Sequence, residues 1–186
     1  NELKLSEKAL KAVFKANSSE EKLHNYSKAL AVYTKHFGYE ALPLLLEAMD
    51  KSNKPFRYSA LNLAEDLGAI AATRQWIEKA KTVNDAVKAE IISMLGRRGD
   101  EYAVDFVKSN FEASLPVVRE EAITALVKLQ ETEAAPVLIV HLAEGSDLEA
   151  SKIALLQLLD KAHLAPVAAQ LDETSGEVKA AFVEII

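Results

Sequence analysis

Apolar and polar residues alternate along this chain with the period of an amphipathic helix. Counted from Val118, apolar residues follow at the fourth, seventh, eighth and eleventh positions, which lie on one side of a helix with 3.6 residues per turn. Similar segments recur every 30 or 31 residues, and they begin at Phe56, Val87, Val118, Leu148 and Val178. A looser copy begins at Tyr26. The pattern predicts a series of helices, each with one apolar face.

A leading helix is predicted ahead of each of these trailing helices. Eleven residues before each start lies an apolar column, formed by Leu45, Trp76, Val107, Val137 and Val167. Prolines that suit the first turn of a helix are Pro43, Pro55, Pro116, Pro136 and Pro166. Polar residues predicted to cap helix N-termini are Ser52, Asn84, Ser114, Asp147 and Ser175. Glycines predicted to end helices are Gly38, Gly68 and Gly99. The repeating unit is therefore a pair of helices.

The motif Val-Arg-x-x-Ala-x-x-Ala-Leu-x-x-Leu at 118–129 resembles the second helix of a HEAT repeat. The period resembles the short HEAT-like form of phycobilin-lyase-type bacterial proteins. The resemblance implies an all-α fold, a right-handed α-α superhelix (HEAT-like or armadillo-type solenoid) of about six helix pairs. Tetratricopeptide arrays fit less well, because their period is about 34 residues. The predicted repeats of this single array are 1–38, 39–68, 69–99, 100–130, 131–160 and 161–186.

Two of these repeats depart from the motif. The basic residue that follows the start elsewhere is replaced by Ser27 in the first copy and by Glu149 in the fifth. In the fifth copy, Lys152 stands at the fourth position, where an apolar residue is expected. The chain begins at Asn1, and its last predicted helix ends in mid-pattern at Ile186, so we expect a piece of a longer protein.

Composition narrows the possible chemistry. The 186 residues include no cysteine, which excludes disulfides, thiol nucleophiles and thiolate metal sites. No apolar run reaches the roughly 18 residues of a membrane span, and no leader sequence is visible, so we expect a soluble protein whose compartment stays open. The net charge of −6 makes nucleic acid an unfavourable partner.

Charge is unevenly distributed along the chain. Residues 1–60 contain 10 Lys and Arg against 7 Asp and Glu, whereas residues 100–186 contain 6 against 16. An acidic second half attracts a basic partner, but it also serves simply to keep the outer helix faces hydrated. Both interpretations stay open at this point.

The resemblance also implies a binding surface, because the second helices of HEAT-like arrays typically line the concave side. Positions two, six and nine after each start point away from the predicted core. These positions and their neighbours give a candidate concave surface formed by Lys28, Lys35, Tyr58, Asn62, Glu65, Ser93, Arg97, Glu120, Thr124 and Lys128. The same positions include Val32, Ala89, Gly96 and Val127. Tyr58 is the aromatic candidate for a binding hot spot.

A basic residue recurs one position after the start of several repeats. The predicted ladder consists of Arg57, Lys88, Arg119 and Lys179. Its structural interpretation is that each cation pairs with a carboxylate or turn carbonyl of the neighbouring repeat. The alternative is that the ladder binds an acidic peptide or a phosphate-bearing chain.

No metal or cofactor site is predicted. The four histidines are His24, His36, His141 and His163, and we expect none to pair with another histidine or a carboxylate at helical spacing. His141 and Trp76 are predicted core residues.

These observations favour a non-catalytic, monomeric scaffold that binds a protein partner through the second helices. One alternative is an accessory repeat region of a multidomain bacterial enzyme. Another is a HEAT-fold DNA-repair glycosylase, with Glu65 or Asp66 as its carboxylate. Its cations would be Lys28, Lys35, Arg57, Lys88 and Arg97. The acidic second half and the core position of the tryptophan oppose this reading, and no residue identifies a bilin pocket.

Overall fold

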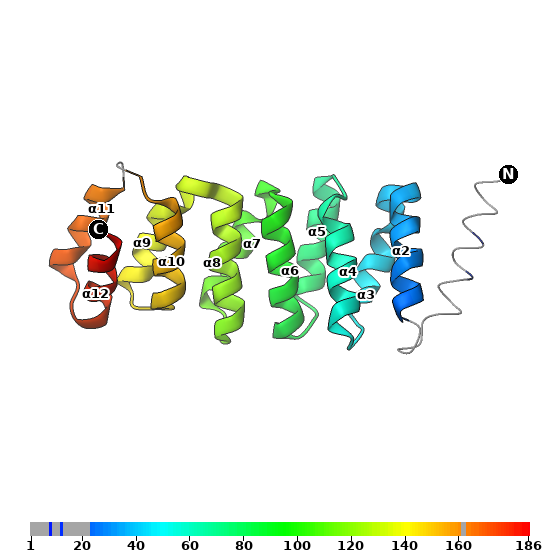
Figure 1. Ribbon diagram of the computed structural model, residues 1–186, viewed down its shortest axis with the longest axis horizontal. Coiled ribbons are helices and arrows are strands. Elements are labelled where there is room, and N and C mark those ends of the chain that lie inside the picture. Colours follow the sequence, from blue (N-terminus) through cyan, green and yellow to red (C-terminus); the bar gives the residue numbers. More distant parts are fainter. Residues whose placement is uncertain (1–7, 9–11, 13–22, 161–162) are drawn as a thin grey trace. The chain divides into compact units, whose positions relative to one another are not determined.

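A computed structural model describes residues 8, 12, 23–160 and 163–186 of the chain (Figure 1). Regular structure within these residues consists of α-helices and short 3-10 helices, without a strand. The predicted all-α class is therefore confirmed. The leading helix that is predicted for repeat 1–38 would lie before Leu23. Of this stretch, only Lys8 and Ala12 are among the described residues. The chain divides into two compact units, Asn1–Met94 (unit 1) and Leu95–Ile186 (unit 2).

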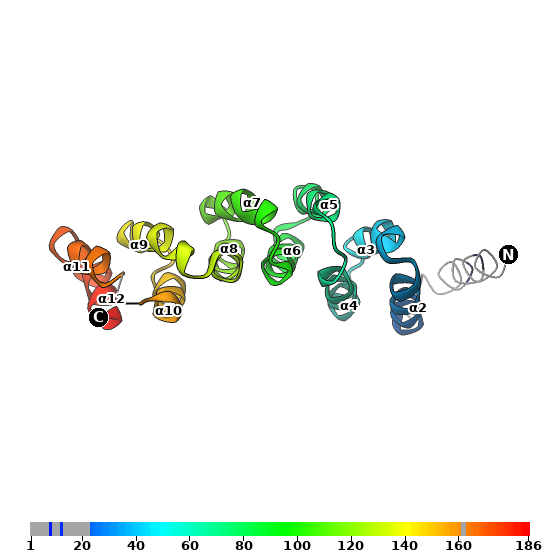
Figure 2. The same ribbon diagram turned by 90° about the horizontal axis from the view of Figure 1, so that it is seen from above.

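Unit 1 is built from antiparallel helix pairs. Its helices are α2 (Leu23–Phe37), α3 (Leu42–Ala48), α4 (Lys54–Glu65), α5 (Ile70–Ala80) and residues 85–94 of α6 (Asp85–Arg98), with the 3-10 turn η2 (Gly38–Ala41) before α3. Figure 2 shows α2 and α4 in one layer and α3 and α5 in the other. Between the layers lie fully buried apolar side chains, among them Leu30, Leu45, Trp76 and Ile91. The predicted core position of Trp76 is confirmed.

Unit 2 repeats this arrangement. Its α-helices after α6 are α7 (Val104–Ser109), α8 (Pro116–Gln130), α9 (Ala135–Ala143), α10 (Leu148–Leu158), α11 (Leu164–Glu173) and α12 (Gly176–Ile185). Its 3-10 turns are η3 (Glu101–Ala103), η4 (Asn110–Glu112) and η5 (Glu131–Ala134). The second helices α8, α10 and α12 lie in one layer and the first helices α7, α9 and α11 in the other (Figure 2). The interior includes Val107, Leu126, Leu138, Leu155 and Phe182.

Helix starts follow the predicted chemistry in part. The prolines occupy the first turns of α3, α4, α8 and α9, as predicted. The side chain of Asn84 caps α6, since its Oδ1 accepts a hydrogen bond from the Val87 N–H at 3.1 Å. At α4 the cap is Asn53, one residue after the predicted Ser52. The predicted caps fail at α8 and α12: the residue before α8 is Leu115, and the Ser175 side chain makes no capping bond.

Left-handed backbone occurs at two of the three predicted glycines. Gly38 and Gly99 have φ of +53° and +68°, a conformation that glycine adopts without steric cost. The prediction is wrong for Gly68, because the positive φ of that turn, +104°, falls on the next residue, Ala69. Composition predicts that such turns contain glycine, but it does not predict which of two adjacent residues adopts the positive φ.

The predicted register is wrong by one residue in the fifth repeat. The buried residue of the leading column is Leu138 instead of Val137, which is only half-buried. In α10 the buried positions are Ser151, Ala154, Leu155 and Leu158. They stand four, seven, eight and eleven positions after Asp147, so the segment begins at Asp147 instead of Leu148.

A tight turn explains this shift. Gly145 and Asp147 both have left-handed φ, +78° and +45°, which reverses the chain between Ala143 at the end of α9 and Leu148 at the start of α10. Asp147 stands at the N-cap position but makes no capping bond with its side chain. The fifth copy is therefore regular, and Lys152 lies beside the apolar column, not in it.

Candidate protein-binding surface

Arg57, the basic residue one position after the start at Phe56, donates four hydrogen bonds. Its Nε and Nη2 donate hydrogen bonds to the two carboxylate oxygens of Glu90 on α6, both at 2.7 Å. Its Nη1 donates to the carbonyls of Lys51 and Ser52 in the turn before α4, at 2.8 and 2.9 Å. Both charged side chains are buried, with 9% and 6% exposure. The bonds to Glu90 raise the pKa of Arg57, against the lowering effect of burial.

Arg119 repeats this geometry in unit 2. Its Nε and Nη2 donate to the Asp147 carboxylate at 2.7 and 2.9 Å, and its Nη1 donates to the carbonyls of Ala113 and Ser114 at 2.9 and 3.2 Å. Hydrogen bonding from Arg119 lowers the pKa of Asp147, and nearby His141 acts in the same direction, while burial opposes both. Each guanidinium thus donates four hydrogen bonds from Nε, Nη1 and Nη2 to acceptors of its own unit.

The two lysines of the predicted ladder behave differently. The Lys88 ammonium contacts Asp85 of its own helix at 3.0 Å. Lys179 is exposed and has no ion-pair partner among the residues that the structure describes. An ammonium lacks the planar fork with which a guanidinium bridges a carboxylate and two turn carbonyls. We call the contact of one guanidinium with a carboxylate and two turn carbonyls an arginine clamp. The ladder therefore consists of two arginine clamps, at Arg57 and Arg119, and two lysines that do not form this contact.

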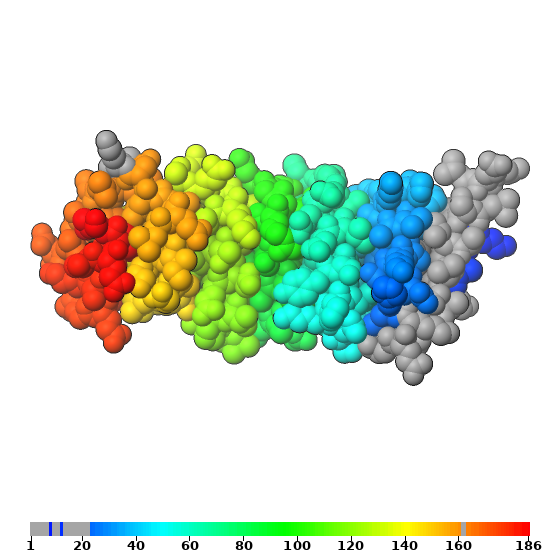
Figure 3. Space-filling model, in the orientation of Figure 1, coloured from blue at the N-terminus to red at the C-terminus, as the bar shows by residue number. Residues whose placement is uncertain are grey.

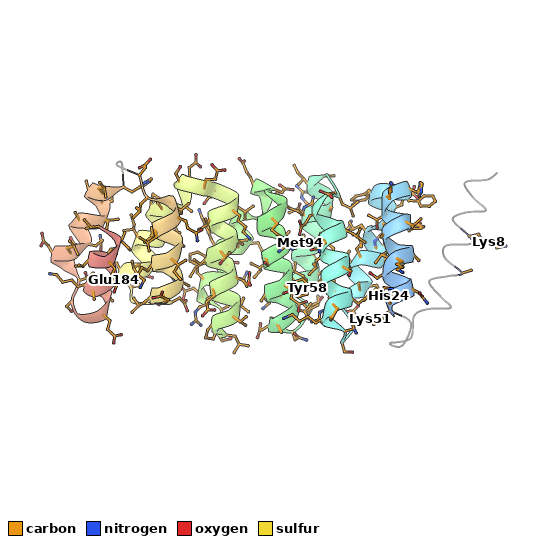
Figure 4. The ribbon with its side chains drawn as sticks, in the orientation of Figure 1. Lys8, His24, Lys51, Tyr58, Met94 and Glu184 are labelled. Atoms are coloured by element: carbon orange, nitrogen blue, oxygen red, sulfur yellow. The ribbon has the colours of Figure 1, made fainter. Side chains whose placement is uncertain are left out.

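Positions two, six and nine of the second helices form the second-helix ridge, which we define for each helix separately. In unit 1 it consists of Lys28, Val32 and Lys35 on α2 and Tyr58, Asn62 and Glu65 on α4. All are exposed except Glu65, which is half-buried. Tyr58 is 40% exposed, and the Lys54 ammonium lies 5.4 Å from its ring centre (Figure 4). This part of the ridge is basic and aromatic.

On α6, two of the three ridge positions are buried. Ala89 and Gly96 were expected to face away from the core, but both are buried. A Cβ added to Gly96 would lie 2.7 Å from the Cα of Ala125, so α8 crosses α6 too closely for any side chain there. Ser93 is half-buried, and only Arg97 is fully at the surface.

In unit 2 the predicted ridge residues Glu120 and Thr124 are exposed on α8, with half-buried Val127 at the ninth position. Lys128 is exposed next to the ridge and lines a polar cleft of about 710 Å³ together with Glu101. The face formed by the second helices of unit 2 is in view in Figure 3.

The corrected register adds ridge residues that the sequence analysis missed. Counted from Asp147, the ridge positions of α10 are Glu149, Ile153 and Leu156. Ile153 and Leu156 are 47% and 53% exposed. They were missed because a start at Leu148 assigns them to other helix faces, although Gly145 in the preceding turn was a signal for a left-handed turn residue.

Charged side chains flank these two aliphatic residues. The Lys152 ammonium lies 2.8 Å from a carboxylate oxygen of Glu149 and 2.7 Å from one of Glu184 on α12. The hydrogen bond that Lys152 donates to Glu149, followed by the one it donates to Glu184, raises the pKa of Lys152. Figure 4 labels Glu184 on α12. The Lys152 ammonium thus bridges the carboxylates of Glu149 and Glu184.

The histidines form no metal site within the described part of the chain, where no three His, Cys, Asp or Glu side chains gather. His141 is buried, as predicted, with its ring centre 4.9 Å from that of Phe111 and its Nε2 3.4 Å from Asp147. The expectation that no histidine has a carboxylate at helical spacing is wrong for His163, whose Nδ1 lies 2.9 Å from Asp160. His24 and His36 are exposed.

The arrangement does not favour a glycosylase groove. Trp76 is completely buried and cannot stack on a base. Of the proposed cations, Arg57 is held by Glu90 and Lys88 contacts Asp85. Asp66 is exposed, and its side chain makes no hydrogen bond or ion pair with the residues that the structure describes.

The repeated helix pairs define the chain as an α-helical repeat protein. The family model for HEAT repeats matches residues 73–159, which extend from α5 through α10. This segment of the chain is thus similar to HEAT repeats. No curated protein matches it. HEAT repeats generally mediate protein–protein interaction, and their all-helical fold is typically non-catalytic. In the described residues, no helix has both the length and the hydropathy needed to cross a membrane.

Proposed function

We propose that this chain is a non-catalytic interaction module whose second-helix ridge binds a partner protein. The observation that carries the proposal is the pair Ile153 and Leu156, aliphatic side chains that are about half exposed at ridge positions of α10. Aliphatic side chains at the surface gain free energy when a partner removes them from water, at roughly 25 cal/mol per Å².

Two surfaces compete as the partner's binding site, the basic ladder and the second-helix ridge. The contacts of the ladder support the ridge. The hydrogen bonds that Arg57 and Arg119 donate all go to a carboxylate or a turn carbonyl of the same unit. A partner anion would have to displace these bonds. The ladder is therefore proposed as structural, joining successive repeats, and the ridge as functional.

We also propose that the six predicted repeats form one right-handed array and that the chain is a monomer in the absence of its partner. The recurrence of the arginine clamp in both units supports a single repeat type. Sedimentation equilibrium of the purified chain tests the monomer, and a mass twice that of the 20.3 kDa chain would contradict it.

Site-specific photocrosslinking tests the proposed surface. A photoreactive phenylalanine replaces Leu156 on the α10 ridge or, as a matched control, Val140, which is 57% exposed on first helix α9. We expect crosslinked products in an extract of the source cells from position 156 and not from position 140. Identical products from both positions, or products from neither, would contradict the assignment of the ridge.

A further inference from the structure

The α10 ridge combines an aliphatic pair with a defined spacing. Ile153 and Leu156 are three residues apart, so they lie on adjacent turns of one helix face. The opposite face of α10 is fixed by the buried side chains of Ala154, Leu155 and Leu158. Val127 holds the equivalent ninth position on α8, which packs against α10. The exposed pair is thus a rigid apolar feature about one helical turn long.

The charge around this pair is negative. The Glu149 and Glu184 side chains are 73% and 60% exposed, and they share the single ammonium of Lys152. Each carboxylate therefore keeps acceptor capacity for a second cation. Unit 2 as a whole contains 8 Lys and Arg against 16 Asp and Glu. Charge complementarity thus requires a basic partner.

The backbone of the surface restricts the partner's conformation. The amides of α10 are bonded within the helix, and no strand edge occurs in the described ranges of the chain. A bound segment gains no ladder of main-chain hydrogen bonds from such a surface, so its own backbone groups must pair internally or stay hydrated. A helix meets this requirement while presenting a strip of side chains to the ridge.

Resting on the proposed function, we propose that the α10 ridge docks a cationic amphipathic helix of the partner protein. Two aliphatic side chains of that helix, three or four residues apart, pack against Ile153 and Leu156. Its flanking Lys or Arg side chains pair with Glu149 and Glu184. The aliphatic contact supplies affinity, and the charges select the basic partner.

The probe is a synthetic 18-residue helical peptide with leucines on one face and lysines on both flanks. Isothermal titration against the full chain is expected to show saturable binding at one site. The same peptide with glutamates in place of lysines is expected to bind at least about tenfold more weakly, and higher salt is expected to reduce the difference.

Variants locate the site. We expect Ile153→Ser/Leu156→Ser to weaken binding of the basic peptide by about tenfold or more, since both anchors are lost, and Val140→Ser to change it less than about twofold. Glu149→Gln/Glu184→Gln is expected to weaken it several-fold, unlike Glu144→Gln directly after α9. Circular dichroism verifies that each variant is folded, and Leu156→Ala provides a milder substitute. Equal effects of the ridge and control variants, or preference for the acidic peptide, would overturn the proposal.

Two results separate this inference from the proposed function. If a partner crosslinks at position 156 but the basic peptide does not displace it, the ridge binds a protein of other chemistry and only the inference fails. If the basic peptide binds the ridge but no partner crosslinks there, the proposed function fails while the surface chemistry holds.

Discussion

Units 1 and 2 share a repeat, but their ridge residues differ in charge and in residue type. On α2 and α4 the ridge carries Lys28, Lys35 and Tyr58, whereas on α10 it carries Glu149, Ile153 and Leu156. Unit 1 has 14 Lys and Arg against 12 Asp and Glu, whereas unit 2 has half as many basic as acidic residues. These exposed ridge residues of α2, α4 and α10 are not part of the buried core, so their chemistry varies without cost to the fold. A repeat motif therefore predicts the architecture, and the ridge must be analysed one helix at a time.

The arginine clamps differ between the units in burial. In unit 1 both partners are buried, whereas in unit 2 the Arg119 side chain is 23% exposed although Asp147 is buried. Water compensates a lost partner better at an exposed guanidinium. Breaking the first clamp should therefore cost more than breaking the second.

The largest effect is expected for Glu90→Gln in unit 1. The substitution leaves the buried Arg57 charge without its carboxylate, and breaking a buried pair typically costs about 3 kcal/mol or more. Chemical denaturation should show this loss, whereas Glu78→Gln, in an exposed pair with Lys81, should change stability by less than about 0.5 kcal/mol. Restoration of most of the stability by Arg57→Met/Glu90→Leu would support the unpaired charge as the cause. A loss below about 1 kcal/mol for Glu90→Gln would contradict it.

Gly96→Ala is expected to destabilise unit 2 by about 1–3 kcal/mol, because the new methyl group would overlap the α8 backbone at Ala125. The control is Gly68→Ala in unit 1, where an added Cβ meets nothing within 4 Å and φ is not positive. Thermal unfolding that ranks the two variants equally would refute the close helix crossing.

Asp147→Asn is expected to cost less than Glu90→Gln, and its effect should depend on pH. The pKa of Asp147 is lowered in the folded chain, so its ionised form adds stability above the unfolded-state pKa of about 3.9. This contribution disappears as the pH falls through the lower folded-state pKa. The difference in unfolding free energy between wild type and variant should therefore shrink below about pH 4.

Arg119 and His141 both face this carboxylate, so the titration is repeated in the His141→Gln background. A difference that stays constant down to pH 2 would exclude Asp147 as its source.

The smallest effect on stability is expected for Leu156→Ser. The side chain is 53% exposed, so its loss should change the unfolding free energy by less than about 0.5 kcal/mol. Leu155→Ser next to it, which is fully buried, serves as the contrast and should cost several times more. Similar costs at both positions would show that Leu156 belongs to the core.

Periodicity predicted much of this fold from the sequence alone. The apolar offsets placed Phe56, Val87 and Val118 correctly, since all three are buried. The fifth repeat was misplaced, because the left-handed backbone of Gly145 and Asp147 in the preceding turn is not visible in a hydropathy pattern.

Long-range partners were equally hidden. The basic ladder was recognisable at Arg57, but nothing local identifies Glu90, 33 residues away, as its partner. The burial of Gly96 follows from the approach of α8, which helical periodicity within α6 does not contain. The misplacement of one turn also concealed Ile153 and Leu156, the residues on which the proposed function rests.

The most direct test is the affinity of the chain for the partner that photocrosslinking identifies. The measurement compares Ile153→Ser/Leu156→Ser on α10 with Val140→Ser on α9, each by titration against that purified partner. We predict a dissociation constant raised about tenfold or more by the first variant and less than about twofold by the second. Equal dissociation constants for both variants would contradict the second-helix ridge as the binding surface.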